Sequence, residues 1–187
     1  TMVLFINRII IINIFFNTNF LYMNFFTRTN NHLNLFICVL FVGTFLRFLI
    51  SFNGYSIDIE HWRINTYLIN LELPIYGFGG NNYGPIWIHL LYYLDKIPIY
   101  YSGDELLNLR YKILFFLTTI DVLIFLIIYK IHSLKIATLF FLNPISIYVT
   151  GFHGQFENLA VLIGLLGVLS FSKFNKKFKY YIFNILL

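Results

Sequence analysis

The chain has 187 residues, of which 59% are hydrophobic and only 11% are charged. A soluble globular domain carries roughly 25% charged residues, so this composition, with a mean hydropathy of +0.75, excludes an ordinary water-soluble domain. The formal net charge of +5 does not indicate a nucleic-acid partner, because Lys and Arg in a membrane protein chiefly set its orientation. We expect an all-α, polytopic bundle of transmembrane helices in contact with membrane lipid.

The N-terminal segment, residues 1–32, allows several interpretations. Residues 2–22 are apolar but are broken by polar side chains, which are Asn7, Arg8, Asn13, Asn17 and Asn19. They could be a signal-like segment, an extra helix, or translated sequence upstream of a true start at Met23. We favour the last of these.

Residues 33–187 are expected to form the N-terminal part of a transmembrane domain. A span needs roughly 20 apolar residues, and the candidate spans are Leu33–Phe52, Tyr111–Tyr129, Ile136–Val149 and Phe156–Phe171. Asn143 and Pro144 should bend or end the third run. A further run begins near Tyr180 and the chain stops inside it, which predicts that the C-terminal helices of a longer protein are missing. The single cysteine, Cys38, excludes an internal disulfide and a cysteine-based metal site.

Basic residues orient these spans, because Lys and Arg favour cytoplasmic loops. They gather in two connections that two spans separate, Lys130–Lys135 and Lys173–Lys179. Both connections should therefore be cytoplasmic, while the acidic segment 53–83 should lie outside. The short run Gly84–Leu94 is then an interfacial or re-entrant helix on the outer face, with Pro85 in its first turn. A full crossing by this run would place both basic connections outside.

The first polar segment of chemical interest follows the first span. Asp58 and Glu60 lie just before Trp62, a residue type that is typical of membrane interfaces. A carboxylate at this position can accept the proton of a hydroxyl whose oxygen attacks an activated carbon. The alternative is a solvated acidic loop without a chemical role.

The second polar segment, Gly151–Asn158, should also lie outside. If a helix begins near Gly154, His153 and Glu157 stack on one of its faces, and Gln155 projects toward the outer site or a neighbouring helix. Backbone N–H groups at a helix entrance favour anions, so His153 could bind a phosphate or a hydroxyl. A structural histidine is the alternative.

Two charged residues lie inside the apolar runs. Asp121 is near the centre of the second span, where a charge is costly and usually faces a partner in the protein interior. Thr118 and Lys112 are its local candidates, and a structural hydrogen bond between helices is the expected role. Arg47 can extend outward along the first span as an anchor, or it can reach a phosphate at the outer surface as a bidentate donor.

Four stretches in this order resemble the GT-C superfamily of polytopic glycosyltransferases, most of all prokaryotic proteins related to the second glycosylphosphatidylinositol mannosyltransferase. They are Asp58–Trp62 ("DIEHW"), Asn82–Leu94 ("NYGPIWIHLLYYL"), Leu109–Lys130 and Phe141–Leu162. The chain departs from the family pattern at Gly84, where the family has Pro, and at His153 and Glu157, where it has Trp and Asp. Dolichyl-phosphate-glucose glucosyltransferases share some of these features.

The resemblance implies an inverting transferase at the outer face of a prokaryotic plasma membrane. It would move mannose or another hexose from a polyprenyl-phosphate carrier to a hydroxyl of a glycan or lipid acceptor, without a cofactor, nucleotide or metal. Asp58 matches the family's catalytic acidic position, with Glu60 beside it. Expected substrate contacts are Arg47, Trp62, Tyr83, His153, Gln155 and Glu157. The alternatives are a transporter or flippase-like subunit, with Asp121 and the His153–Glu157 pair on an ion path, or an inactive fragment.

Overall fold

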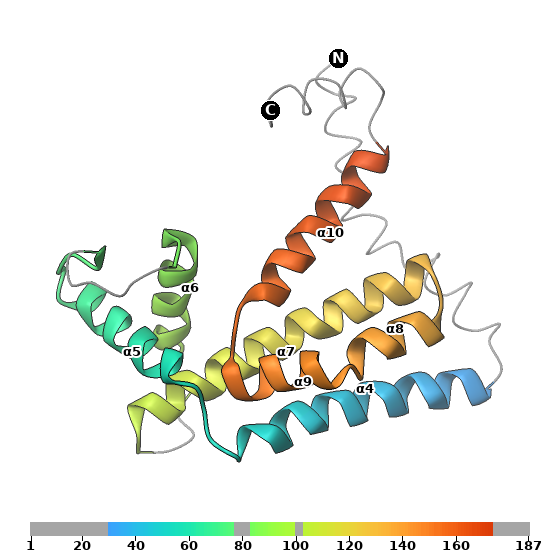
Figure 1. Ribbon diagram of the computed structural model, residues 1–187, viewed down its shortest axis with the longest axis horizontal. Coiled ribbons are helices and arrows are strands. Elements are labelled where there is room, and N and C mark those ends of the chain that lie inside the picture. Colours follow the sequence, from blue (N-terminus) through green and yellow to red (C-terminus); the bar gives the residue numbers. More distant parts are fainter. Residues whose placement is uncertain (1–29, 77–82, 100–102, 174–187) are drawn as a thin grey trace. The chain divides into compact units, whose positions relative to one another are not determined.

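The computed structural model describes residues 30–76, 83–99 and 103–173, and within these ranges all regular structure is helical (Figure 1). The elements are α4 (Asn30–Ser51), α5 (Ile57–Asn70), α6 (Pro85–Lys96), α7 (Glu105–Ile131), α8 (Leu134–Phe141), α9 (Pro144–Tyr148), the π-helix η2 (Val149–His153) and α10 (Glu157–Lys173). The chain divides into two compact units, residues 1–38 with 163–187, and Val39–Leu162. All the candidate site residues lie in Val39–Leu162. The run expected near Tyr180, and nearly all of segment 1–32, lie outside the described residues.

Two helices are long and apolar enough to cross a membrane, Asn31–Ser51 within α4 and Glu105–Ile131, which is α7. Both were expected from hydropathy. The third expected run is a pair of helices, Leu134–Phe141 and Pro144–His153, bent by 46°. The bend at Asn143 and Pro144 is confirmed. The Asn143 side chain accepts from the backbone N–H of Ile145 at 2.9 Å, which caps α9 as Pro144 begins it.

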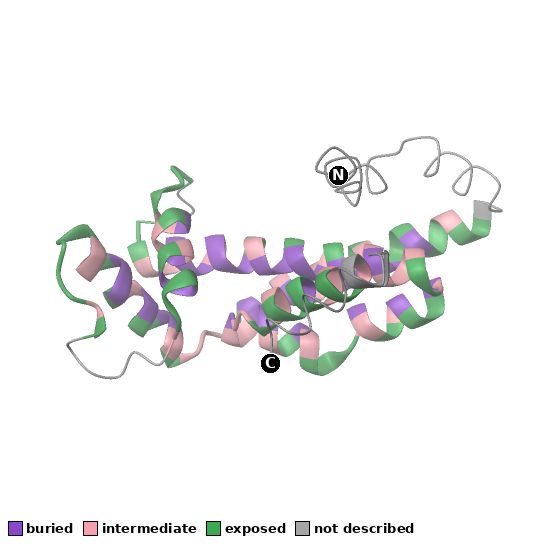
Figure 2. Ribbon diagram, turned by 90° about the horizontal axis from the view of Figure 1, so that it is seen from above, coloured by how far each residue is buried: buried purple, intermediate pink, exposed green. Residues whose placement is uncertain are grey.

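Helix α7 is the element against which α5, α6, α8 and η2 pack. It begins earlier than hydropathy predicts, because Asp104 caps it by accepting from the backbone N–H groups of Leu106 and Leu107. Buried residues recur along it at helical spacing: Leu109, Ile113, Leu117, Ile120 and Ile124. Figure 2 colours buried parts of the ribbon purple.

Helices α5 and α6 form a small pair that packs on α7. Helix α6 has 12 residues, so it reaches only about 18 Å at 1.5 Å per residue and is too short to cross the hydrocarbon. Between the two helices, Trp62 and Trp87 meet edge to face at 5.2 Å. Trp62 is 0% exposed, so its indole does not reach the surface of the protein. Its indole is core between α5 and α6.

Helix α4 approaches its neighbours closely at two glycines. A Cβ on Gly43 would lie 2.3 Å from the Phe141 ring of α8, and a Cβ on Gly151 would lie 2.6 Å from the main-chain oxygen of Arg47. Small residues at helix contacts allow this approach. It brings η2 against α4 and sets the position of the segment that follows η2.

Candidate functional site

Asp58 lies in the first turn of α5, where the partial positive charge of the helix terminus favours a carboxylate. The side-chain amide of Gln155 donates a hydrogen bond to its Oδ2 atom. The hydroxyl of Ser56 lies 3.4 Å from the same oxygen and 3.3 Å from the main-chain oxygen of His153. The structure therefore brings together the two polar segments, which are 97 residues apart at Asp58 and Gln155.

Tyr83 belongs to the same cluster. Burial raises the pKa of its phenol above the ordinary value, a hydrogen bond with Gln155 opposes that shift, and the negative charge of Asp58 and then of Glu157 adds to it. The phenol therefore stays protonated at neutral pH and remains a hydrogen-bond donor. Asp58, Tyr83, Gln155 and Glu157 form what we call the acidic cluster.

Several aromatic side chains pack beside the acidic cluster. Phe156 stacks on Trp87 with ring centroids 4.7 Å apart and meets Tyr83 edge to face at 5.6 Å. Trp62 meets Tyr83 in the same way at 5.7 Å. The indole N–H groups of Trp62 and Trp87 are buried and have no hydrogen-bond partner among the described residues. Because Trp62 is fully buried, it does not offer a surface to a substrate in this conformation, contrary to expectation.

Glu60 and His153 lie differently from the acidic cluster. Glu60 is exposed, and two residues along a helix turn the side chain by about 200° relative to Asp58. The His153 ring meets the rings of Tyr148 and Phe152 edge to face, at 5.2 and 5.4 Å.

The expectation that His153 and Glu157 stack on one helix is wrong. His153 ends η2, Gly154 is left-handed with φ of 67°, and α10 begins only at Glu157. A glycine is required at this bend because left-handed backbone is costly for other residues.

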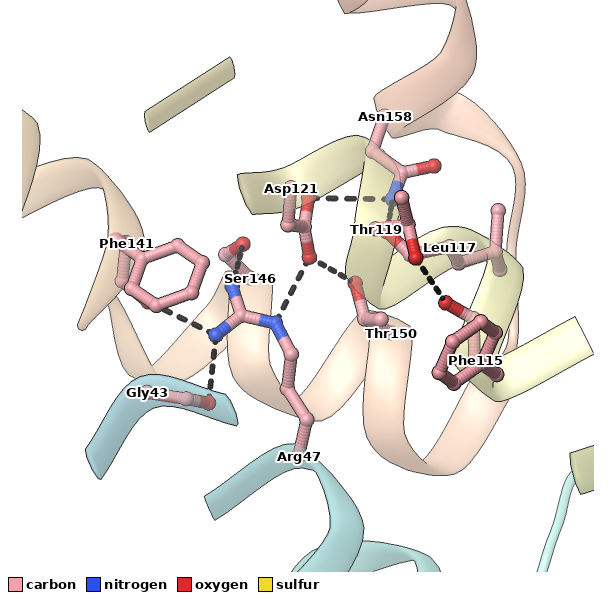
Figure 3. Close-up of polar contacts among 10 residues, drawn as sticks. All are labelled: Gly43, Arg47, Phe115, Leu117, Thr119, Asp121, Phe141, Ser146, Thr150 and Asn158. Carbon is pink, nitrogen blue, oxygen red and sulfur yellow. Dashed lines mark hydrogen bonds and ion pairs between the residues drawn. The ribbon is translucent and has the colours of Figure 1, made fainter. Parts of the chain in front are cut away.

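A second polar group is built around Asp121 in α7 (Figure 3). Its Oδ2 atom accepts from Arg47 Nε at 2.8 Å and from Thr150 Oγ1 at 2.7 Å, and its Oδ1 atom accepts from Asn158 Nδ2 at 3.1 Å. The side chains of Arg47 and Asp121 are both 0% exposed. Buried charges are tolerated only when they are paired and hydrogen-bonded, and here three other elements supply the partners.

All three guanidinium nitrogen atoms of Arg47 donate hydrogen bonds within this network. Its Nη1 atom donates to the main-chain oxygens of Gly43 and Phe141 at 2.9 and 3.1 Å, and Nη2 donates to Ser146 Oγ at 3.2 Å. The guanidinium also lies 4.4 Å from the centre of the Phe141 ring. The expectation that Arg47 extends to the membrane surface and binds a phosphate is therefore wrong.

The interhelical role expected for Asp121 agrees with this geometry, but its expected partners do not. The Thr118 hydroxyl has no partner among the described residues, and Lys112 donates to the main-chain oxygen of Asp95. The two Asp121 oxygens instead accept from Arg47, Thr150 and Asn158, which other elements bring to them.

Several residues of both groups were not singled out from the sequence: Ser56, Trp87, Phe156, Ser146, Thr150 and Asn158. Asn158 follows Glu157 within a polar segment, so its type and place were a usable signal. Thr150 and Ser146 offered none, because hydroxyls near the ends of apolar helices usually bond their own backbone.

No protein-family model, curated protein or solved structure matches this chain. Within residues 30–76, 83–99 and 103–173, no group of three or more His, Cys, Asp or Glu side chains could hold a metal ion.

Proposed function

We propose that this chain belongs to an integral membrane glycosyltransferase that uses a polyprenyl-phosphate-linked sugar. Asp58 takes the proton of an acceptor hydroxyl as the hydroxyl oxygen bonds to the anomeric carbon. The bond from that carbon to the phosphate oxygen breaks with inversion, and the polyprenyl phosphate leaves with the electron pair. The sugar is mannose or another hexose, and the acceptor is a glycan or a lipid at the outer face of the membrane.

The observation that carries this proposal is the contact between Gln155 and the carboxylate of Asp58. A base must be held in one orientation to act on a bound hydroxyl, and Gln155 and Tyr83 are neutral donors that can hold it without taking its proton. Asp58 is only half-buried, so a hydroxyl can approach it.

The four stretches that resemble the GT-C superfamily also support the proposal. Asp58 and Trp62 come from the first stretch, Tyr83 and Trp87 from the second, and Gln155 and Phe156 from the fourth, and they gather in one place. The third stretch supplies Asp121, which binds Thr150 and Asn158 of the fourth. We propose that His153 donates a hydrogen bond to the donor phosphate or the acceptor, while Arg47 has no part in binding.

The decisive experiment supplies a membrane preparation containing the full-length protein with polyprenyl phosphate that carries a labelled hexose. We expect label to move to endogenous glycan or lipid with inverted anomeric configuration, and not to move from a nucleotide-linked hexose. Reporter fusions at Asn70 and Lys176 should lie on opposite sides of the membrane. Transfer only from the nucleotide sugar, or both reporters on one side, contradicts the proposal.

One observation favours a membrane transporter as a second candidate. The bend between α8 and α9 leaves the main-chain oxygen of Phe141 free of its helix, and that oxygen accepts from the buried Arg47. Transporters place ion sites at such breaks. Flux of ions or protons into proteoliposomes, lost on Asp121→Asn, would support this candidate over the transferase.

A further inference from the structure

The carboxylate of Asp121 holds both ends of one short segment. Thr150 in η2 donates to Oδ2 at 2.7 Å, and Asn158 in the first turn of α10 donates to Oδ1 at 3.1 Å. Gln155 lies between these two residues in the chain and donates to Asp58. We propose that Asp121 is a positioning residue that fixes the segment 150–158 and thereby keeps Gln155 against Asp58.

The backbone of this segment explains why it needs such an anchor. The chain passes from the π-helix η2 through the left-handed Gly154 before α10 begins. A π-helical turn is an uncommon conformation that surrounding contacts must maintain. Bonds from both ends of the segment to one carboxylate limit how far the residues between them can move.

The surrounding hydrogen bonds hold the Asp121 side chain in one position. Its side chain is 0% exposed, and Arg47 on α4 donates to it at 2.8 Å. Asn158 Nδ2 also donates to the main-chain oxygen of Leu117 at 2.9 Å, which ties α10 to the same turn of α7. A charged acceptor forms stronger hydrogen bonds than a neutral one, so a carboxylate suits this role better than an amide.

The protein contains a natural reporter for this arrangement. The 187-residue sequence has two tryptophans, Trp62 and Trp87, and both are buried on α5 and α6. Phe156, next to Gln155, stacks on Trp87 at 4.7 Å, and a Cβ on Gly154 would lie 3.7 Å from the Trp62 ring. If the segment moves away, water and soluble quenchers reach indoles that they do not reach in the wild type.

The test uses variants that release the segment but leave the Arg47–Asp121 pair intact. Thr150→Val and Asn158→Leu each remove one bond to Asp121. Asn158→Leu also removes the bond to the main-chain oxygen of Leu117, so the double variant removes three bonds. Thr118→Val is the matched control, since that buried hydroxyl has no partner among the described residues. Each full-length protein is purified in detergent, and tryptophan emission, acrylamide quenching and circular dichroism are recorded.

We expect a red shift of emission and a higher quenching constant for each single variant, and a larger change for the double variant. The control should match the wild type, and helix content should stay constant in all. Wild-type emission and quenching in the double variant overturn the inference. A loss of helix in the double variant also overturns it, because these bonds would then support the whole bundle and not one segment.

The role of Asp121 in catalysis rests on the proposed function, whereas its hold on the segment does not. If the fluorescence changes as expected but the wild-type protein transfers no sugar, the proposed function fails and the positioning role stands. If the wild type transfers sugar and the double variant keeps both its emission and its rate, the positioning role fails and the proposed function stands.

Discussion

The side-chain amide of Gln155 donates a hydrogen bond to the carboxylate of Asp58, 97 residues earlier in the chain. Asp58 is in the first turn of α5, and Gln155 lies between η2 and α10. An amide donates through its NH₂ group and does not titrate, so the carboxylate is the only one of the two that can accept a proton. In the proposed reaction, Asp58 is therefore the base and Gln155 orients it.

Asp58→Asn should lower sugar transfer by about 10²–10⁴-fold, the usual contribution of a positioned general base. The amide keeps the size of the carboxylate but cannot take the hydroxyl proton. The rate of label transfer is measured in membranes with matched protein levels. Glu60→Gln, which alters the exposed neighbour, is the control and should keep most of the activity. A near wild-type rate for Asp58→Asn removes this residue from the reaction.

Gln155→Leu should lower kcat while the protein still folds. The variant removes a hydrogen bond to a charged group, which is worth about 1.5–3 kcal/mol and corresponds to about a 10- to 100-fold slower reaction if it is lost in the transition state. Steady-state rates against donor concentration separate kcat from KM. A change confined to KM would instead make Gln155 a substrate contact.

Arg47→Met should destabilise the protein by about 3–5 kcal/mol, because it leaves the buried carboxylate of Asp121 without its counter-charge. Arg47→Met combined with Asp121→Leu should recover most of that loss. Unfolding by denaturant in detergent measures both. Arg63→Met is the control. Arg63 pairs with Asp95 at 3.0 Å and with the exposed Glu105, and its side chain is 21% exposed, so water reaches these pairs and we expect a smaller loss than at Arg47. Equal effects of the two single variants would contradict the burial of the Arg47 pair.

Gly151→Ala should destabilise the protein by about 1–3 kcal/mol, as overpacking of a close contact does. The added Cβ would lie 2.6 Å from the main-chain oxygen of Arg47, so η2 and α4 must separate. Gly164→Ala is the control, because a Cβ there meets nothing within 4 Å. Thermal unfolding compares the two, and a variant at Gly151 as stable as the wild type would show that the two helices separate without cost.

Tyr83 should titrate above its ordinary pKa of 10.0, because burial disfavours the phenolate. The raised pKa in the folded state means that its contribution to stability is fully present below the pKa of the unfolded chain. That contribution is lost as pH rises through the higher folded value. The difference in tyrosinate absorbance between the wild type and Tyr83→Phe gives the folded midpoint. A midpoint at the ordinary value of 10.0 would place this phenol in water and not in the acidic cluster.

Hydropathy and local capping chemistry determined much of the fold from the sequence. The lengths of the apolar runs predicted α4 and α7, because a helix that spans a membrane needs many consecutive apolar side chains. Proline predicted the start of α6 and the bend before α9, because Pro144 cannot continue the hydrogen bonding of α8. These features depend on residues close together in the chain.

The partners of the polar residues were decided by the tertiary structure alone. From the sequence, Arg47 was expected to extend to the surface and Asp121 to bond another helix without a named partner there, and the two residues form a buried ion pair. Nor did the sequence show that Trp62 is buried against Trp87 between α5 and α6. The partner of a buried charge depends on which faces of different helices pack together. Residue spacing along a single helix does not contain that information. The meeting of Asp58 with Gln155 has the same origin, since η2 and Gly154 determine where the second polar segment lies.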